Sequence, residues 1–439
     1  MQGTGQTDSG APAGGQRARR RILIVAFHFP PVQGSTGVYR ALSFAKHLPS
    51  HGWDVTVLTS TLNAYPETRA ENLSIIPRDT RVVRAWTLDT QRHLAIAGRY
   101  PQILATPDRW QSWIASGVVA GLGVIRSWHP HAILSTYPIP SAHSIGLALH
   151  RMSGVPWIAD FRDPMLQDTY PHQPILRRAY ASIERATFKH ANRITVTTPG
   201  TAELYVGRYA QRPAQSIHVI ANGFDEDMFA NSVAADAAGR EAVAPVQGER
   251  RPLQLLHSGL LYPHERNPEL FFQAVAELLQ EGALGEGEVL FTLRASGNEA
   301  AYQKRLAELK LDQVMRLMPA VPYRDALVEM LGSDACLIFQ ARSCNQQIPA
   351  KVYEYLYARK PILGLTDPDG DTGRLLANTG ATHIAALEDK AGMKRAIRDF
   401  VGALRDGTAP CAPRDVVMQY SRRASSERLA ALLDEVVVS

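Results

Sequence analysis

Residues 253–278 read LQLLHSGLLYPHERNPELFFQAVAEL, and this stretch decides the fold. An apolar run ends at Gly259, a polar loop follows, and a helical repeat of apolar residues begins after Asn267 and Pro268. A strand followed by a loop and an amphipathic helix is the unit from which parallel sheets are built. Proline is favoured at the first helical position, where its missing N–H is not needed. The stretch therefore predicts one strand–helix unit of a parallel α/β sheet.

The same alternation extends in both directions along the 439-residue chain. We predict an α/β protein of two facing, Rossmann-like, doubly wound domains with a cleft between them, because ligands of such sheets bind beyond the carboxyl ends of the strands. The strands expected in the first domain are 21–27, 54–60, 81–86, 132–137, 156–161, 193–198 and 217–221. Those expected in the second are 253–259, 289–296, 314–318, 335–340, 361–366 and 382–387.

The predicted organisation has five parts. A disordered basic leader over 1–20 precedes a first domain over 21–230. Residues 231–252 are rich in Ala, Gly, Pro and charge without helical or strand periodicity, so they are expected to be a linker. A second domain over 253–415 and a closing C-terminal helix over 416–439 complete the chain.

Composition and charge exclude several classes of protein. With 45% hydrophobic and 20% charged residues, the chain has the make-up of a soluble globular protein. Of the net charge of +5, the four arginines at 17, 19, 20 and 21, less Asp8, supply +3, so the charge does not indicate a nucleic-acid partner. The leader lacks the apolar core of a secretory signal. Three cysteines without metal-binding spacing fit a reducing cytoplasm and predict no metal site.

A segment rich in tryptophan raises the question of membrane contact. The longest apolar run, 114–125, is about half of the roughly 20 residues that a spanning helix needs. From Trp110 to Trp128, tryptophan and aliphatic residues recur at near-helical spacing between Arg109 and Arg126. This pattern is typical either of a helix lying in a membrane interface or of a buried helix of the domain, and the buried helix is favoured.

The loop after the first expected strand is a candidate ligand-binding turn. Gly34, Ser35, Thr36 and Gly37 form a tight turn before a helix, whose amides and dipole favour a bound anion. Arg40 would face the cleft from the first turns of that helix. The Gly-x-x-Gly spacing, with no acid after the second strand, argues against NAD. Plain packing and turn chemistry is an equal alternative.

Charged residues also follow the expected strand 156–161. Asp160, Arg162 and Asp163 stand where a buried strand ends, a position where charge is useful if it faces a cleft. A solvated salt bridge is the alternative. His143 lies in the first turns of the helix after the preceding strand, where a capping or core histidine is the commoner outcome.

The second domain carries the more specific pattern. Arg266 precedes the helix that Asn267 and Pro268 begin, beside amides able to bind phosphate. In the stretch 340–365, QARSCNQQIPAKVYEYLYARKPILGL, Lys351 lies in the first turn of a helix and Glu354 about one turn later. A cation in a first turn opposes the helix dipole, and a bound diphosphate would explain it. Glu354 would then accept hydrogen bonds from ribose hydroxyls.

The segment IPAKVYEYLYARKPILGL resembles the donor-site helix of family 4 glycosyltransferases, which have the GT-B fold. The Gly-rich first loop, the DFRDP turn, VIANGFD at 219–225 and HSGLLYPHERNP occur in the family's order. The family has two Glu separated by seven residues; Glu354 matches the second, and Gln346 replaces the first. Leu260 or Leu261 stands where the family often has Arg, and Arg266 takes the place of its Lys. The DFRDP turn is similar to that of a subgroup making bacterial surface polysaccharides.

The resemblance implies a metal-independent, retaining transfer of a sugar from a UDP- or GDP-sugar, without any other cofactor. The family often has a histidine at the DFRDP position, and which of its three charged residues inherits that contact with the sugar is left open. The expected catalytic residues are Asp160, Arg162, Asp163, Arg266 and Lys351. Residues expected to bind the donor are Gly34, Gly37, Gly259, Arg266, Asn345, Gln346, Lys351, Glu354 and Thr372, and those expected to bind the acceptor are Ser35, Thr36, Arg40 and His143.

The expected acceptor is a lipid-linked saccharide or a growing polysaccharide, which places the protein in the cytoplasm or on the cytoplasmic face of the inner membrane. Two alternatives stay open. One is a sugar-nucleotide epimerase or hydrolase with the same double-Rossmann architecture. The other is a non-catalytic partner in polysaccharide assembly, suggested by leucine after Gly259 and glutamine at 346.

Overall fold

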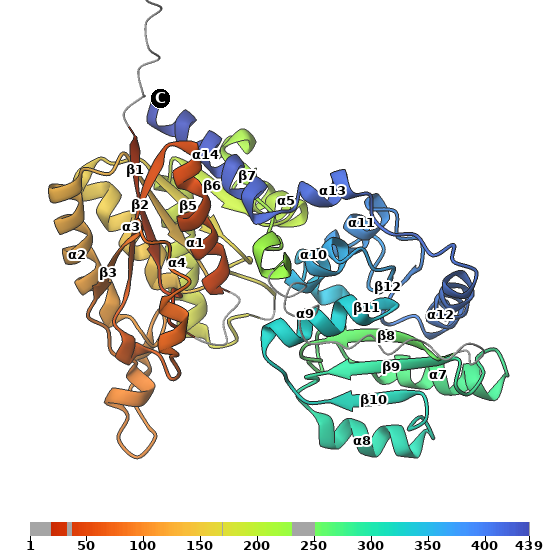
Figure 1. Cartoon of the computed structure of the whole chain (residues 1–439). Helices are drawn as coiled ribbons and strands as arrows, with labels where there is room; N and C mark the ends of the chain where they lie inside the picture. Colours follow the sequence, from red (N-terminus) through yellow and green to blue (C-terminus); the bar gives the residue numbers. More distant parts are fainter. Residues whose placement is uncertain (1–18, 33–36, 169, 231–250, 439) are drawn as a thin grey trace, which may run out of the picture.

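The structure is a computed structural model that describes residues 19–32, 37–168, 170–230 and 251–438 (Figure 1). Two parallel sheets with interleaved helices make up the described chain, which confirms the predicted α/β class. Most of the predicted leader and linker lie outside the described residues, as do Gly34, Ser35 and Thr36.

The first sheet has seven parallel strands in the order β3-β2-β1-β4-β5-β6-β7. Its central strands β1, β4 and β5 are mostly buried, as both faces of a parallel sheet are covered by helices. The strands are β1 (Arg20–Ala26), β2 (Trp53–Ser60), β3 (Arg81–Ala85), β4 (Ala132–Thr136), β5 (Trp157–Phe161), β6 (Arg193–Val196) and β7 (Ile217–Val219). The longer helices are α1 (Gly37–His47), α2 (Ser112–Trp128), α3 (Pro140–Ser153), α4 (Pro174–His190) and α5 (Pro199–Arg208).

The second sheet has six parallel strands in the order β10-β9-β8-β11-β12-β13. They are β8 (Leu253–Ser258), β9 (Val289–Arg294), β10 (Met315–Met318), β11 (Ala335–Phe339), β12 (Ile362–Leu365) and β13 (Ile384–Ala385). The helices are α7 (Glu269–Gln280), α8 (Glu299–Glu308), α9 (Tyr323–Gly332), α10 (Ala350–Tyr357), α11 (Asp371–Asn378), α12 (Lys390–Arg405) and α13 (Arg414–Met418). In each sheet the strand order reverses direction beside the first strand, β1 or β8, and this is where such sheets bind ligands.

The last helix, α14 (Arg422–Val438), returns to the first domain and lies beside α1 (Figure 1). Leu429, Leu433 and Val436 join the core that Ile22 and Ile24 of β1 form. The chain therefore crosses between the domains twice, and the start of α14 lies near the region between them.

The tryptophan-rich helix α2 is a buried helix of the first domain. Trp113 is 0% exposed, and Trp110 and Trp128 pack against the same core. Gly117 and Gly121 let α2 approach α3 closely. The interfacial alternative is therefore wrong for this helix, because its large apolar side chains face inward. No helix in the described part of the chain is long and apolar enough to cross a bilayer.

Candidate active site

A crevice of about 290 Å³ lies between the two domains, at the carboxyl ends of the strands. Both domains and the start of α14 contribute to its walls. The lining includes Tyr39, Arg40, Arg162 and Asp163 of the first domain, Arg266, Tyr323, Cys344, Gln347, Pro349 and Glu354 of the second, and Arg422 of α14. Five residues predicted for the site thus line one cavity.

Lys351 is held at the junction of β8 and the first turn of α10. A Cβ atom on Gly259 would lie 2.7 Å from the Lys351 Nζ, and Gly259 has a φ of +118°, so glycine is required there. The Nζ also lies 3.3 Å from Nε2 of His257. His257 Nδ1 lies 3.0 Å from the Leu337 carbonyl, and its Nε2 also lies 3.1 Å from the Gly259 carbonyl, so the Lys351 ammonium shares Nε2 with a backbone oxygen.

The charge on Lys351 is poorly compensated. Burial, and then the nearby Arg266 guanidinium, lower the pKa of Lys351 to about 7. Arg266 donates only to the Leu260 carbonyl, at 3.3 Å, and lies over the Tyr262 ring. No carboxylate of the described residues forms an ion pair with either cation. A buried cation whose pKa is lowered by a second cation nearby forms with it a site suited to an anion.

Glu354 lies one turn after Lys351 and, unlike Lys351, lines the crevice. Its carboxylate accepts a hydrogen bond of 2.6 Å from the Tyr323 hydroxyl. Burial raises the pKa of Glu354, and the bond from Tyr323 opposes this shift. The Tyr323 ring stacks on Tyr39 of α1, with ring centroids 6.0 Å apart, and Arg422 lies over the other ring of this pair. These contacts join the two domains across the crevice.

Asp160 does not reach the crevice. It is 0% exposed, and its carboxylate accepts from Arg40 at 2.8 and 2.9 Å, from Thr136 at 2.8 Å and from Thr195 at 2.7 Å. The catalytic role predicted for Asp160 is therefore wrong, since no face of the carboxylate is left for a substrate. Arg40 does line the crevice, but its guanidinium is committed to Asp160 and the Ile220 carbonyl. The ion pair of Arg40 and Asp160 therefore holds the first-domain wall of the crevice in place.

Arg162 and Asp163 follow β5 and line the crevice. The buried Nε of Arg162 has no hydrogen-bond partner among the described residues. Burial raises the pKa of Asp163, while Arg162 acts to lower it. Of the three charged residues in the DFRDP turn, these two are therefore the ones available to a ligand.

His143 is not at the crevice. The side chain is 0% exposed and packs against Phe161, with ring centroids 4.5 Å apart. Its Nδ1 lies 2.8 Å from the Ser135 hydroxyl, and burial lowers its pKa to about 3. The prediction that His143 binds the acceptor is wrong, because the α3 face that carries it points into the core.

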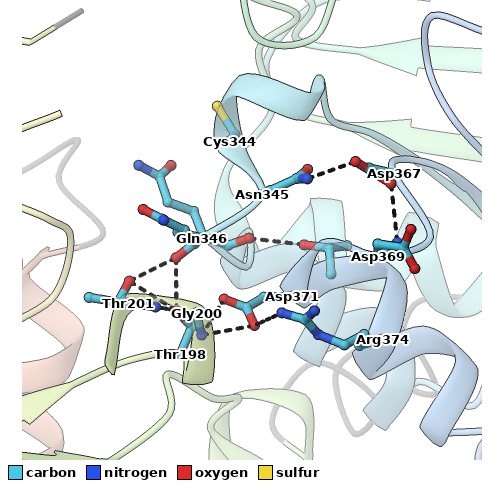
Figure 2. A network of polar contacts seen from close by, with 12 residues as sticks. Thr198, Gly200, Thr201, Cys344, Asn345, Gln346, Asp367, Asp369, Asp371 and Arg374 are labelled. Atoms are coloured by element: carbon cyan, nitrogen blue, oxygen red, sulfur yellow. Dashed lines mark hydrogen bonds and ion pairs between the residues drawn. The ribbon is translucent and has the colours of Figure 1, made fainter. Parts of the chain in front are cut away.

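The loop after β11 is held by the other domain through the backbone carbonyl of Gln346 (Figure 2). The Gln346 carbonyl accepts from the Thr198 and Thr201 hydroxyls of the first domain at 2.8 and 2.9 Å. Close by, the Gly200 amide donates to the Asp371 carboxylate at 3.0 and 3.1 Å. We call these contacts the interdomain latch.

Two side chains predicted to bind the donor in this region make other contacts instead. Asn345 donates to Asp367 at 2.7 Å, and Thr372 is buried and donates to the Gln347 carbonyl at 3.1 Å. Neither they nor Gln346 line the crevice, so the donor contacts predicted for these three side chains are not supported. Their neighbours Cys344 and Gln347 do line it. A loop without periodicity gave no signal for which residues face the cavity.

Gly37 begins α1 and lines a small hollow beside Arg162 instead of the crevice itself. Three residues that sequence reasoning missed are Tyr39, Tyr323 and Arg422. They come together only through the placement of α1, α9 and α14. In the part of the chain that the structure describes, no group of three His, Cys, Asp or Glu could hold a metal ion.

The first domain of the chain matches a known protein family. Residues 36–223 match the family of the glycosyl transferase 4-like domain. This match contains α1, β5 and the first-domain wall of the crevice, and it confirms the predicted resemblance for this part of the chain. No curated protein sequence matches the chain. The surface-polysaccharide subgroup stays a prediction.

Solved structures resemble the chain over nearly its full length. Sucrose-phosphate synthase from Thermosynechococcus elongatus has a TM-score of 0.67 at 13% identity and covers 96% of this chain and 100% of its own. A glycosyltransferase from Rickettsia africae has a TM-score of 0.62 at 12% identity, with 96% and 99% covered. UDP-GlcNAc 2-epimerase from Neisseria meningitidis, bound to UDP-GlcNAc, has a TM-score of 0.53 at 11% identity, with 95% and 100% covered. The chain has the GT-B fold.

Proposed function

We propose that the protein is a retaining glycosyltransferase, which moves a sugar from a UDP- or GDP-sugar to an acceptor hydroxyl. The observation that carries the proposal is the pairing of Arg266 and Lys351 beside the crevice, without carboxylate partners among the described residues. A diphosphate supplies the negative charge that these cations lack. Glu354, one turn on, is then placed for the ribose hydroxyls.

The two cations act on the leaving group. As the bond from the anomeric carbon to the diphosphate lengthens, negative charge grows on the phosphate oxygens, and preorganised cations stabilise it. In the retaining mechanism that the resemblance implies, the departing diphosphate takes the acceptor's proton on the same face of the sugar. Asp163 and Arg162 face the crevice from the opposite domain, where they position the acceptor and the sugar.

We propose a lipid-linked saccharide or growing polysaccharide as the acceptor, with the protein bound at a membrane surface. Support comes from a turn over 91–104 that projects from the first domain (Figure 1). Ile96 and Ile103 are 84% and 63% exposed there, beside the exposed Arg99. The interval 90–107 contains no acidic residue. Apolar tips with nearby cations fit an anionic lipid surface.

A donor screen tests the transferase proposal. Thermal unfolding is measured against a panel of UDP-, GDP- and dTDP-sugars, because a ligand of the folded state raises the unfolding temperature. The labelled donor that binds is then incubated with and without saccharide acceptors. Transfer that depends on an acceptor supports the proposal. Conversion of the donor without an acceptor identifies an epimerase or hydrolase instead, and a chain that binds no donor is a non-catalytic partner.

Vesicle flotation tests the membrane contact. We expect the wild-type protein to float with vesicles that contain anionic lipid at low salt, and Ile96→Asp with Ile103→Asp to abolish this. Val119→Asp is the matched control, since Val119 is 73% exposed on α2. A protein that stays in the soluble fraction, or a double variant that floats like the wild type, overturns this part of the proposal.

A further inference from the structure

Arg162 connects the crevice to a second, smaller hollow within the first domain. It lines both cavities, and the small one is also walled by His28, Tyr137 and Ile139. The Nε of Arg162 is buried, and no described residue accepts a hydrogen bond from it. The neighbouring Arg40, by contrast, forms a complete set of bonds with Asp160 and the Ile220 carbonyl. Arg162 is thus a buried cation at the crevice without a fixed partner.

His28 offers a second unpartnered group beside the same hollow. It follows β1, and its buried Nδ1 has no hydrogen-bond partner among the residues that the structure describes. Burial, and then Arg162, lower the pKa of His28 to about 4, so its ring is neutral at neutral pH. Buried polar atoms in folded proteins are usually hydrogen-bonded. The hollow has a volume of about 10 Å³, so it has room for one oxygen atom of a ligand whose remainder lies in the crevice.

The charge of the walls indicates that this ligand is an anion. Of the four arginines that line the crevice, Arg40 is paired with Asp160 and Arg422 with Asp225, so Arg162 and Arg266 are the two without an ion pair among the described residues. Under the proposed function, Arg266 and Lys351 of the second domain hold the donor diphosphate, which leaves Arg162 free to bind a second anion. A guanidinium matches the paired oxygens of a phosphate or carboxylate. Asp163 repels an anion on its own side, so the ligand belongs on the side of His28.

We propose that Arg162 and His28 form a subsite for an anionic group, phosphate or carboxylate, carried by the acceptor. The inference rests on the proposed function, because it takes the second-domain cations as the site of the donor. It narrows the substrate class to acceptors that are themselves negatively charged. A neutral acceptor would leave the buried Nε of Arg162 without a hydrogen-bond partner throughout the reaction.

The test is a titration of protein already saturated with UDP or GDP, whichever binds more tightly. Inorganic phosphate is added at constant ionic strength, and its binding is followed by broadening of its ³¹P resonance. We expect the loaded wild type to bind phosphate and Arg162→Gln to bind it at least about tenfold more weakly, the effect of losing one charge-assisted contact. Arg151→Gln, at the exposed far end of α3, is the control and should behave like the wild type.

Two further measurements separate the outcomes. Arg266→Gln should lose the nucleotide, so this variant is titrated with phosphate in the absence of nucleotide. If it binds phosphate and the double variant Arg162→Gln with Arg266→Gln does not, the subsite is upheld even if the donor assignment fails. Glucose 6-phosphate and glucuronate distinguish a phosphate from a carboxylate, and binding of either upholds the proposal. If the loaded wild type binds none of the three anions, or if Arg162→Gln keeps nucleotide and anion affinity at wild-type levels, the subsite is ruled out.

Discussion

The Tyr323 hydroxyl donates a 2.6 Å hydrogen bond to the carboxylate of Glu354, the group proposed to bind ribose. The bond satisfies a half-buried carboxylate that would otherwise lose its hydration without compensation. Tyr323 also stacks on Tyr39 of the opposite domain, so one side chain serves both the carboxylate and the domain contact. A ribose hydroxyl that binds Glu354 would donate the hydrogen bond that the Tyr323 hydroxyl donates in this structure.

Tyr323→Phe tests this exchange. The variant keeps the ring and its stacking but removes the bond to Glu354, so we expect the free energy of unfolding to fall by about 1–3 kcal/mol without ligand. Nucleoside diphosphate binding should be as tight as in the wild type or tighter, because a competing donor is gone. Tyr302→Phe is the control, since Tyr302 donates to the Leu261 carbonyl outside the crevice. Calorimetric binding that is much weaker in Tyr323→Phe would contradict the exchange.

The interdomain latch makes a prediction about two glycines of one helix. A Cβ atom on Gly200 would lie 2.5 Å from the Asp371 carboxylate, whereas one on Gly207 would meet nothing within 4 Å. Gly200→Ala should therefore cost about 1–3 kcal/mol in urea unfolding and weaken nucleotide binding, because it forces the domains apart. Gly207→Ala should be neutral or stabilising by up to about 1 kcal/mol. Equal behaviour of the two variants would show that the latch does not hold the domains.

Asp160→Ala separates a structural from a catalytic role. Removing this carboxylate leaves the Arg40 guanidinium buried and uncompensated, so we expect a loss of about 3–5 kcal/mol in the free energy of unfolding. Asp163→Ala, at the partly exposed neighbouring position, should cost much less. A fully stable Asp160→Ala protein with impaired turnover would restore the catalytic assignment.

The central strands, such as β1 and β11, were predictable because each is a buried apolar run bounded by turn residues, and a parallel sheet needs both its faces covered. Arg266 and Glu354 were predictable as crevice residues because Arg266 lies just before α7 and Glu354 lies within α10, and both helices follow a strand. Tyr39, Tyr323 and Arg422 were not, because their meeting depends on how two domains and a returning helix are placed. His143 was misassigned because helix position alone does not tell which face meets the sheet.

The depressed pKa of Lys351 predicts that ligand binding takes up a proton. With a pKa of about 7 in the empty crevice, most Lys351 side chains are neutral at pH 8, and a bound diphosphate favours the ammonium. Of the groups around it, His257 has a pKa lowered by burial and is neutral, and Glu354 has a pKa raised by burial. Affinity should therefore fall as pH rises above about 7.

Calorimetry in buffers of different ionisation enthalpy measures this uptake. We expect close to one proton to be taken up per nucleoside diphosphate at pH 8, and clearly less at pH 6. Lys351→Met should abolish the difference between the two pH values. Wild-type binding at pH 8 without proton uptake would show that Lys351 does not meet the diphosphate.

The most direct test of the account is the affinity of UDP and GDP for Arg266→Ala and Lys351→Ala, measured by calorimetry against the wild type. Each variant loses one charge-assisted contact with the diphosphate, so we predict binding weakened at least about tenfold and, with the full donor, a loss of about 2–4 kcal/mol of transition-state stabilisation. Lys304→Ala, on the exposed face of α8, should bind like the wild type. Wild-type affinity in both crevice variants would contradict the claim that these two cations hold the donor.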